Sequence, residues 1–550
     1  MSGGQECDSS VESAAGGWGR WQAQLALMLA LPVMLTGLYG TNYVFLAAHT
    51  PHRCHVPECE GNISHGAPPP PPEQWQPDWA AWALPVASAA DAACRRHSPR
   101  ALVAADADTA CHPHSFDNTT RQECDNYVYQ FHVSIVPEFD LACQEWKRSL
   151  VGTVHNVGML ISLPIMGYVS DRYGRRAALI TSGVGAGVLG LCKSFVASYH
   201  AYLFAEFIET VLGASVYPSA FVLMIEWLGV EQRILASLVL GIPLAGGAAL
   251  LALLDYMAGY WRVWARIAYP PSFLLLAYPW LLPESVRWLV TRGRLREATA
   301  AVRRAARVNK RHVPEAALQK MLTADADPLA EKAEVAVQIE DESLFRAFFK
   351  YGVLRVRLSV CFVWWVSAVF VFYGLAVRAH ALFGEPHVNY ALLAAAELPA
   401  LLANTLLLDR IGRRPLLTAA FLFTATALIA IPCLPPALSA GAAGTALYLA
   451  GKVGATMSLN ALYVYSAELF PTRARHRLLA ACSTLGRLGA ILAPLTPLLA
   501  SLRWWVPTAL FGALPLLSAA LTRLVPDTLH QRLPDSFADL DTRSDDTELP

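Results

Sequence analysis

One short charged turn occurs twice in this sequence, and each copy lies between two long apolar segments. The first copy (DRYGRR) runs from Asp171 to Arg176, and the second (DRIGRR) runs from Asp409 to Arg414. Nearly identical turns at corresponding places in two halves of a chain indicate an internal duplication. Because the flanking segments are long enough to cross a bilayer, the duplication predicts a membrane protein built from two similar halves.

The composition agrees with a chain that lies mostly within a lipid bilayer. Hydrophobic residues make up 55% of the sequence and charged residues 16%. The apolar residues form blocks of about 20, the length of a helix that crosses a hydrocarbon core of about 30 Å. The first block is too long for a cleaved signal peptide and is expected to act as a signal anchor. We expect twelve spanning helices, at residues 21–46, 148–169, 177–197, 201–225, 234–256, 263–282, 356–377, 387–408, 415–434, 441–465, 478–500 and 503–524.

The polar segment 47–145, between the first two spans, has the features of an extracellular loop. It contains six of the eleven cysteines: Cys54, Cys59, Cys94, Cys111, Cys124 and Cys143. An even number of cysteines in one polar segment predicts disulfides in an oxidising compartment, although sequence alone does not choose the pairing. Two glycosylation sequons, at Asn62 and Asn118, lie in the same loop. Nearby histidines suggest zinc as an alternative, but the spacing is irregular and no metal site is expected.

Polar segments also divide the rest of the chain. A basic linker can bind nucleic acid or lipid head groups, but the positive-inside bias explains it more simply as a cytoplasmic segment. We therefore expect no nucleic-acid partner, and we expect both termini in the cytoplasm. The expected units are an N-terminal tail (1–20), a first six-helix unit with the loop (21–283), a basic linker (284–355), a second six-helix unit (356–525) and an acidic tail (526–550).

Two six-span halves, each with this turn after its second span, resemble the major facilitator superfamily. Finer motifs resemble the organic cation, anion and zwitterion carriers of solute carrier family 22. These motifs are EFDLAC (138–143), PESVRWL (283–289), Gly451-Lys452 and AELFPTR (467–473). The resemblance implies an all-α membrane protein in which two six-helix bundles surround a central cavity. It also implies a multi-pass protein of the plasma membrane that moves small organic ions by alternating access.

Charged residues near the repeated turns are candidates for contacts that form in one state of a carrier and break in the other. Glu226 precedes Arg233 after the fourth span, just as Glu468 precedes Arg475 after the tenth. We expect each Glu to pair with that Arg, and the Asp of each turn to pair with Arg residues at neighbouring helix ends. A purely topological role is the alternative. The gating set is Asp171, Arg172, Arg175, Arg176, Glu226, Arg233, Asp409, Arg410, Arg413, Arg414, Glu468 and Arg475.

Ionisable residues inside spans are costly and usually functional. Glu397 lies in the eighth span and Arg487 in the eleventh. The resemblance implies that Arg at the second position is typical of anion and carnitine carriers, and Glu at the first of cation and zwitterion carriers. Together they predict a substrate with two charges, its carboxylate bound by Arg487 and its ammonium by Glu397. The aromatic residues Trp365, Tyr373 and Tyr217 complete the candidate substrate site, because ring faces attract organic cations.

The fourth span departs from the family pattern, because Glu206 stands before Phe207 where the family often has Arg, and Glu209 follows one turn later. This arrangement is similar to insect carriers of carcinine and β-alanine. We therefore predict a secondary-active or facilitative carrier of small organic zwitterions or cations, with an organic anion exchanger or a transport-inactive receptor as alternatives. Sodium or a proton is the expected coupling ion. His155 in the second span could relay protons or could be a packed neutral residue.

Catalytic motifs are missing from the sequence. It contains no P-loop, no zinc-protease motif and no nucleophile elbow. We therefore expect neither an enzyme nor a cofactor. The expected partners are a small organic ion, the coupling ion and the lipid bilayer.

Overall fold

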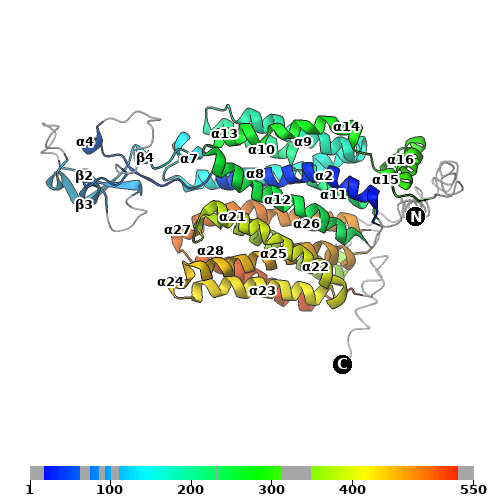
Figure 1. The fold of residues 1–550 in the computed structure, drawn as a ribbon. Coiled ribbons are helices and arrows are strands. Elements are labelled where there is room, and N and C mark those ends of the chain that lie inside the picture. Colours follow the sequence, from blue (N-terminus) through cyan, green and yellow to red (C-terminus); the bar gives the residue numbers. More distant parts are fainter. Residues whose placement is uncertain are drawn as a thin grey trace, which may run out of the picture.

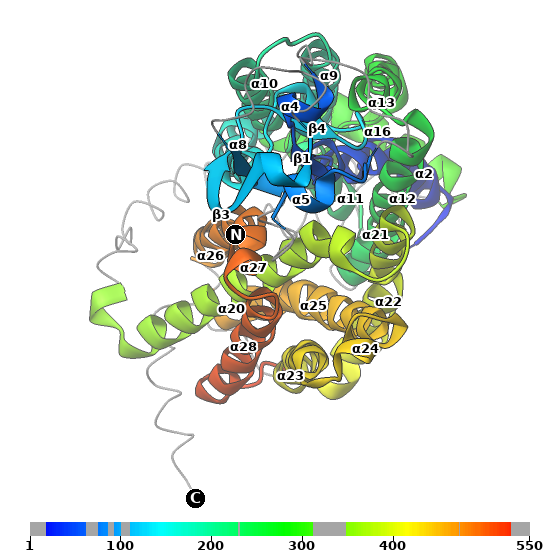
Figure 2. The same ribbon diagram turned by 90° about the vertical axis from the view of Figure 1, so that its left-hand side faces the viewer.

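The computed structural model describes residues 18–61, 75–85, 93–100, 111–228, 232–311, 348–471 and 474–529. In these ranges the chain forms two helical bundles that lie side by side, with a small domain projecting from one end (Figures 1 and 2). The sequon at Asn62 and most of both terminal tails lie outside the described residues.

The N-terminal bundle contains the first half of the expected spans. Its long helices are α2 (Arg20–Tyr39), α8 (Glu145–Tyr173), α9 (Arg175–Lys193), α10 (Tyr199–Gly213), α11 (Val216–Ile225) and α12 (Arg233–Ala258). Helix α2 packs along α12, and α10 packs against both α8 and α9. A short helix, α3 (Tyr43–Leu46), follows α2 after a break at Gly40.

The predicted sixth span at 263–282 is wrong as a single continuous helix. The chain instead forms α13 (Trp261–Ala268), the 3-10 helix η5 (Pro270–Ala277) and α14 (Tyr278–Leu281). Pro270 and Pro271 account for the break, because proline has no N–H to donate and disfavours helical geometry in the preceding residue.

The C-terminal bundle repeats the arrangement of the first. Its long helices are α20 (Gly352–Val377), α21 (Pro386–Ala395), α22 (Glu397–Ile411), α23 (Arg413–Cys433), α25 (Ala442–Leu469), α26 (Arg475–Leu492) and α28 (Val506–Leu521). Short elements η8 (Ala493–Leu495) and α27 (Thr496–Leu502) continue α26. The eighth expected span is divided between α21 and α22, so Glu397 becomes the first residue of a helix inside the bundle.

Nine helical segments among the described residues are long and apolar enough to cross a membrane. They correspond to nine of the twelve expected spans. The other three contain α9, the broken segment α13 to α14, and α25, whose small and polar residues lower its mean hydropathy. A membrane crossing by these three segments stays a prediction.

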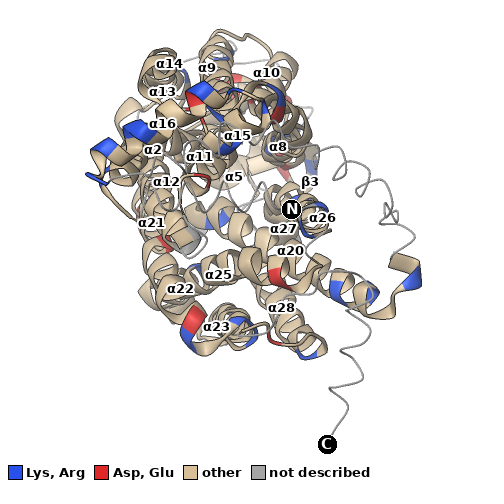
Figure 3. Cartoon of the chain, turned by 90° about the vertical axis from the view of Figure 1, so that its right-hand side faces the viewer, with Lys and Arg blue, Asp and Glu red and all other residues tan. Residues whose placement is uncertain are grey.

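The first part of the basic linker lies at the end of the molecule opposite the small domain, which we call the linker end (Figures 1 and 3). It forms α15 (Val286–Thr291) and α16 (Leu295–Val308). Helix α16 buries an apolar face that includes Val302, and it carries arginines elsewhere (Figure 3). Just beyond it, Asn309 accepts a hydrogen bond of 2.8 Å from the N–H of Trp21, which fixes the linker to the start of α2.

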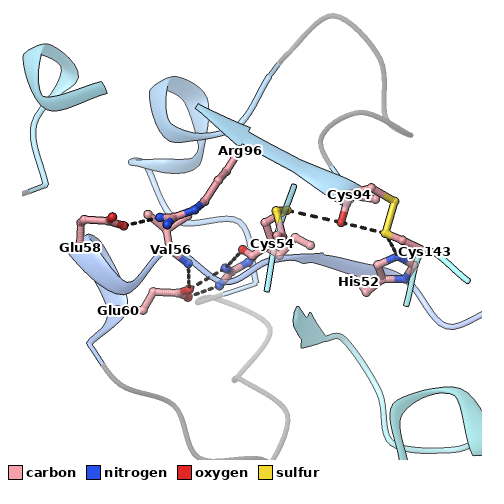
Figure 4. The surroundings of a disulfide bond; sticks show 11 residues. His52, Cys54, Val56, Glu58, Glu60, Cys94, Arg96 and Cys143 are labelled. Atoms are coloured by element: carbon pink, nitrogen blue, oxygen red, sulfur yellow. Dashed lines mark hydrogen bonds and ion pairs between the residues drawn. A yellow bond between two sulfur atoms is a disulfide. The ribbon is translucent and has the colours of Figure 1, made fainter. Parts of the chain in front are cut away.

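The described residues of the cysteine loop (47–145) form the small domain at the other end, which we call the loop end. It contains two antiparallel pairs of strands, β1 (His52–Cys54) with β4 (Tyr127–Tyr129) and β2 (Arg95–Pro99) with β3 (Phe116–Glu123). Three disulfides join the six cysteines, as Cys54–Cys124, Cys59–Cys111 and Cys94–Cys143. His52 lies beside the third disulfide (Figure 4). The two sulfur atoms there are bonded to each other and are therefore not thiolate ligands for zinc.

One carboxylate of the cysteine loop makes several hydrogen bonds to the N-terminal bundle. Glu138, at the end of α7 (Ile135–Glu138), accepts hydrogen bonds from the Tyr260 hydroxyl at 2.9 Å, the Trp261 indole at 2.5 Å and the Arg262 guanidinium at 2.7 Å. The backbone N–H of Trp261 also donates to the carbonyl of Val133 at 2.9 Å. The loop is thus joined to α13 by several hydrogen bonds around one half-buried carboxylate.

Removing the disulfide between Cys54 and Cys124 should unfold the cysteine loop. This bond closes a segment of 70 residues, and its loss should cost about 4 kcal/mol of loop stability on chain-entropy grounds. We expect the double variant Cys54→Ala/Cys124→Ala to show strongly reduced delivery to the cell surface and increased protease sensitivity of the loop. The matched control is Cys192→Ala, which removes a free and exposed cysteine. Normal delivery and protease resistance of the double variant would contradict the prediction.

Candidate functional site

The first copy of the repeated turn joins α8 to α9 through a glycine with left-handed backbone geometry. Gly174 has φ 107°, a conformation that other residues adopt only with strain. Arg175 follows and donates to Asp171 at 2.9 Å and to the carbonyl of Ser170 at 3.0 Å. Its guanidinium also reaches Glu226, just after α11, at 3.3 Å. The turn therefore links three consecutive helices at the linker end.

The second copy has the same geometry in the C-terminal bundle. Gly412 has φ 104° and separates α22 from α23. Arg413 contacts Asp409 at 3.0 Å and donates to the carbonyl of Leu408 at 3.3 Å. It also reaches Glu468, at the end of α25, at 3.0 Å. The two copies of the turn therefore make corresponding contacts in the two bundles.

A second acid caps the helix that follows each turn, and sequence reasoning missed this role. Glu284 accepts the backbone N–H groups of Arg175 and Arg176, and Asp527 accepts those of Arg413 and Arg414 at 3.1 and 3.3 Å. A Cβ atom on Gly174 would overlap Glu284, so the glycine also makes room for the cap. Burial raises the pKa of the Glu284 carboxyl, although the N–H groups of Ser285 and the two arginines act in the opposite direction.

A sequence signal for both caps exists. Pro283-Glu284-Ser285 follows the last helix of the first half, and Pro526-Asp527-Thr528 follows the last helix of the second half. These tripeptides share the pattern of proline, acid and hydroxyl residue, and they form a further internal repeat.

The predicted pairings at the linker end have different outcomes. Asp171 and Asp409 contact Arg175 and Arg413, which begin the neighbouring helices, as expected. Glu468 contacts Arg413 and also accepts from Thr528 at 2.5 Å, two contacts that were not expected. The pairs of Glu226 with Arg233 and of Glu468 with Arg475 stay predictions.

The other members of the gating set lie around these two centres. Arg176 donates to the backbone carbonyls of Pro279 and Leu282. Arg172 and Arg410 are exposed on the turns. Arg233 begins α12 and Arg475 begins α26, and the side chain of Arg233 lies outside the described atoms.

Glu397 already has a charged partner that sequence reasoning did not assign to it. Lys452 of α25, only 2% exposed, lies 2.8 Å from the Glu397 carboxylate. Its ammonium also lies 3.2 Å from the centre of the Phe372 ring. The pairing could have been anticipated, since a second charge inside an apolar segment usually compensates the first.

Arg487 differs from Glu397 in that its hydrogen-bond partner is neutral. It donates to the Tyr373 hydroxyl at 3.3 Å. Among the described residues, no carboxylate lies within ion-pair distance of its guanidinium. The structure therefore joins Arg487 to the predicted Tyr373 but does not pair it with Glu397.

The remaining predicted aromatic residues are packed. Trp365 is 1% exposed, donates to Ser466 at 3.1 Å and meets the ring of Tyr463 edge to face with centroids 4.5 Å apart. Tyr217 lies in α11 and stacks on Phe221 at 6.1 Å. Tyr463, which is 47% exposed, is the better placed of these rings to meet a ligand.

A larger buried charge cluster lies in the N-terminal bundle. Lys193 of α9 donates to Glu206 at 2.5 Å, to Glu209, and to the Tyr269 hydroxyl at 3.2 Å. His155 of α8 contacts the other oxygen of Glu206 at 2.7 Å. All five side chains are buried. The sequence analysis had singled out the two acids and the histidine, but it missed Lys193 at the end of an apolar segment.

A cavity inside the N-terminal bundle reaches this cluster. It is formed by residues of α2, α8, α9, α10, α11 and η5, and its wall includes Tyr39, His155 and Glu209. The cavity has about 30 Å³ of space that the centre of a water molecule can occupy. The charge cluster is thus buried in the protein and adjacent to a space that water can enter.

Comparison with known proteins agrees with this architecture. The family profile described as Major Facilitator Superfamily matches residues 147–494. The xylose transporter XylE of E. coli, in its inward open conformation, superposes with a TM-score of 0.60 over 95% of this chain and 99% of its own, at 13% identity, which is a likeness of fold alone.

Sequence relatives define the family more narrowly. Solute carrier family 22 member 7 of Rattus norvegicus is 29% identical, over 97% of this chain and 98% of its own. Organic cation/carnitine transporter 2 of the same species is 30% identical, over 96% and 92%. An organic cation transporter-like protein of Drosophila melanogaster is 29% identical, over 78% and 76%. The chain belongs to the major facilitator superfamily and, within it, to solute carrier family 22.

Replacing Arg413 should slow turnover more than replacing Asp171. Arg413 links Asp409, Leu408 and Glu468, whereas the Asp171 side chain is 77% exposed and, within the described part of the chain, pairs with Arg175 alone. Loss of charge-assisted hydrogen bonds of this kind costs about 1.5–3 kcal/mol, so Arg413→Ala should lower the transport rate about tenfold or more at normal surface density. Uptake normalised to biotinylated surface protein measures this, with the exposed Arg523→Ala as the control. A normal rate in Arg413→Ala would contradict a gating role.

Proposed function

We propose that this multi-pass membrane transporter carries small organic zwitterions or cations, such as carnitine and β-alanine, which combine an ammonium with a carboxylate, or the cation carcinine. The observation that carries the proposal is the uncompensated charge of Arg487. Glu397 and Lys452 neutralise each other, whereas Arg487 faces only a hydroxyl among the described residues. A substrate carboxylate would supply the missing negative charge and would form a bidentate pair with the guanidinium.

Glu397 provides the complementary interaction in this proposal. A substrate ammonium would compete with Lys452 for the carboxylate, since both groups are cations of similar size. The exchange costs less than breaking a buried pair outright, because Glu397 is never left without a counter-charge. Phe372 lies against the same cation position and would attract an organic ammonium through its ring face.

An organic anion carrier is the second candidate, and the Glu397–Lys452 pair favours it. If Lys452 stays bound to Glu397 throughout transport, the three charges sum to one positive charge, which suits a substrate with a carboxylate alone. One relative is named a cation/carnitine transporter, and carnitine is a zwitterion. Zwitterions and anions are therefore the two substrate classes proposed for this chain.

Uptake by charge-neutralised variants should separate the two substrate classes. A radiolabelled panel of carnitine, β-alanine, carcinine, tetraethylammonium and p-aminohippurate is measured with and without sodium. We expect Arg487→Gln to reduce uptake of the carboxylate compounds about tenfold or more, as expected for the loss of a buried charged hydrogen bond. We expect Glu397→Gln to reduce uptake of carnitine and β-alanine but not of p-aminohippurate. The control is Arg523→Gln, on the exposed surface.

The panel can also contradict the proposal. Undiminished uptake of carnitine and β-alanine by Arg487→Gln would exclude its role as the carboxylate site. If uptake falls in Arg487→Gln but does not change in Glu397→Gln, the result would favour the anion carrier. Absence of any saturable uptake at normal surface density would favour a receptor that uses the cysteine loop.

Alternating access is the proposed mechanism, and the contacts between the bundles support it. At the loop end, Asp255 of α12 contacts His387 of α21 at 3.1 Å, and Thr41 forms a hydrogen bond with Tyr390. The ring of Phe45 packs between His387 and Tyr390. By contrast, the charged pairs described at the linker end each stay within one bundle. The structure is thus closed between the bundles at the loop end.

The same proposal places the cysteine loop outside the plasma membrane and both termini inside. Three disulfides support an oxidising environment for the loop. Asn118 lies on β3 with an exposed side chain, as a glycosylation site requires. Under this orientation, opening toward the cell exterior would require Thr41 to separate from Tyr390.

A covalent link across the two bundles at the loop end should stop transport. We expect the variant Thr41→Cys/Tyr390→Cys, treated with a short thiol cross-linker, to lose most of its uptake, because the bundles then stay closed on that side. Each single-cysteine variant is compared after the same treatment. The matched control is Thr418→Cys/Thr522→Cys, a pair 2.8 Å apart within the C-terminal bundle. Full activity of the cross-linked Thr41–Tyr390 variant would be incompatible with alternating access through this face.

A further inference from the structure

We propose that His155 and Glu206 form the binding site for a coupling proton, so that this carrier moves its substrate together with H⁺. The inference rests on the proposed transport function and deepens it by assigning the coupling ion to one residue pair. It is carried by the hydrogen-bond geometry around a single imidazole, by the charge balance of its neighbours and by an adjacent cavity.

The two ring nitrogens of His155 both meet oxygen atoms. Nε2 lies 3.1 Å from the backbone carbonyl of Gly40, and Nδ1 lies 2.7 Å from Oε1 of Glu206. A carbonyl oxygen only accepts hydrogen bonds, so for both contacts to be hydrogen bonds Nε2 must carry a proton. The contact at Nδ1 then needs another proton, which belongs either to an imidazolium or to a protonated carboxyl. In both cases the pair holds one proton more than a neutral histidine next to a carboxylate.

The remaining hydrogen bonds of the cluster are consistent with this count. Lys193 uses its three N–H donors on Glu206, Glu209 and the Tyr269 hydroxyl. Tyr269 in turn donates to Glu209 at 2.5 Å, which requires an accepting carboxylate there. With the extra proton, one ammonium and one further positive charge balance two carboxylates. Without it, one negative charge would stay uncompensated inside the membrane, which is costly.

Several helices contribute titratable groups around His155. Glu206 and Glu209 come from α10, Lys193 from α9, and Tyr43 from α3, with its ring 5.0 Å from the imidazole. Tyr269, the residue before η5, contacts Glu209 of the same cluster. On the opposite side of α8, the hydroxyl of Thr153 donates to the carbonyl of Ile491 in α26, the helix that also carries Arg487.

A proton can reach this pair and leave it again. His155 and Glu209 both line the cavity inside the N-terminal bundle, which is open on one side. The surrounding helices exclude the pair from lipid, since His155 is 2% exposed and Glu206 is 0% exposed. A buried site next to a water-accessible space is the arrangement that a transported proton needs.

Release of the proton would break a contact next to the closed face. A neutral imidazole has one N–H, so it can satisfy either Gly40 or an ionised Glu206, but not both. Gly40 ends α2, and the next residue, Thr41, bonds to Tyr390 across the two bundles. Deprotonation would therefore loosen the segment that closes the loop end. The proton-loaded state is the closed one in this scheme.

Infrared difference spectroscopy tests the proton site directly and needs no substrate. The full-length protein in lipid nanodiscs is titrated from about pH 8 to about pH 5, the range in which histidine charge changes. We expect a carboxyl or imidazole signal that disappears in His155→Gln and in Glu206→Gln. The control variant His200→Asn, on the exposed surface of α10, should keep it. Identical difference spectra for wild type and both variants would overturn the proposal.

Proteoliposome uptake tests the coupling. Labelled β-alanine and carnitine are supplied in sodium-free buffer with and without an inward gradient of about one pH unit, which can support up to about tenfold accumulation for one proton per substrate. We expect the gradient to stimulate wild-type uptake, and we expect the ratio of uptake with the gradient to uptake at equal pH to fall to about one in His155→Gln. Gradient-driven uptake that survives in His155→Gln, or wild-type uptake that ignores the gradient, would overturn the inference. If wild type takes up no panel compound, the proposed function fails, and the spectroscopic difference alone decides whether the pair binds a proton.

Discussion

A charge inside a membrane protein must be compensated by another group of the protein, because lipid cannot solvate it. This constraint organises the interior of the molecule. Lys193 lies between two acids in the N-terminal bundle, and Lys452 neutralises Glu397 in the C-terminal bundle. Arg487 stands apart because its described partner is a hydroxyl. The positions where compensation is incomplete, or depends on a proton, are the positions where a transported species can contribute to it.

The two copies of the repeated turn share their backbone geometry as well as their sequence. Both linker-end turns contain a glycine with φ near 105°, each followed by an arginine that reaches the end of a helix two spans later. Both following helices have an acid from the end of their own half at the N-terminus, where the free N–H groups favour a negative charge. Each bundle is thus locked at its linker end by its own residues. Such self-contained ends allow two bundles to move as units.

Much of the fold could be predicted from the sequence, because hydropathy and the repeated turn constrain it strongly. The superfamily, the two-bundle plan and the cysteine content of the loop domain were all accessible in this way. The break at Pro270 and Pro271 was not, since prolines within an apolar block are also compatible with a kinked continuous helix. Ion pairs were harder still. Spacing along the chain did not indicate that Glu468 contacts Arg413, and the partners of Glu397 and Glu206 come from other helices.

The attachment of the cysteine loop has a mechanical consequence. Glu138 fixes the loop to α13 through Tyr260, Trp261 and Arg262, all of which belong to the N-terminal half. If the two bundles rotate relative to each other, the loop domain moves with the N-terminal bundle as a rigid body. Its position relative to the loop end of the C-terminal bundle then changes. The distance between a fluorophore on β3 and another at the loop end of α28 would then report the angle between the two bundles during the transport cycle.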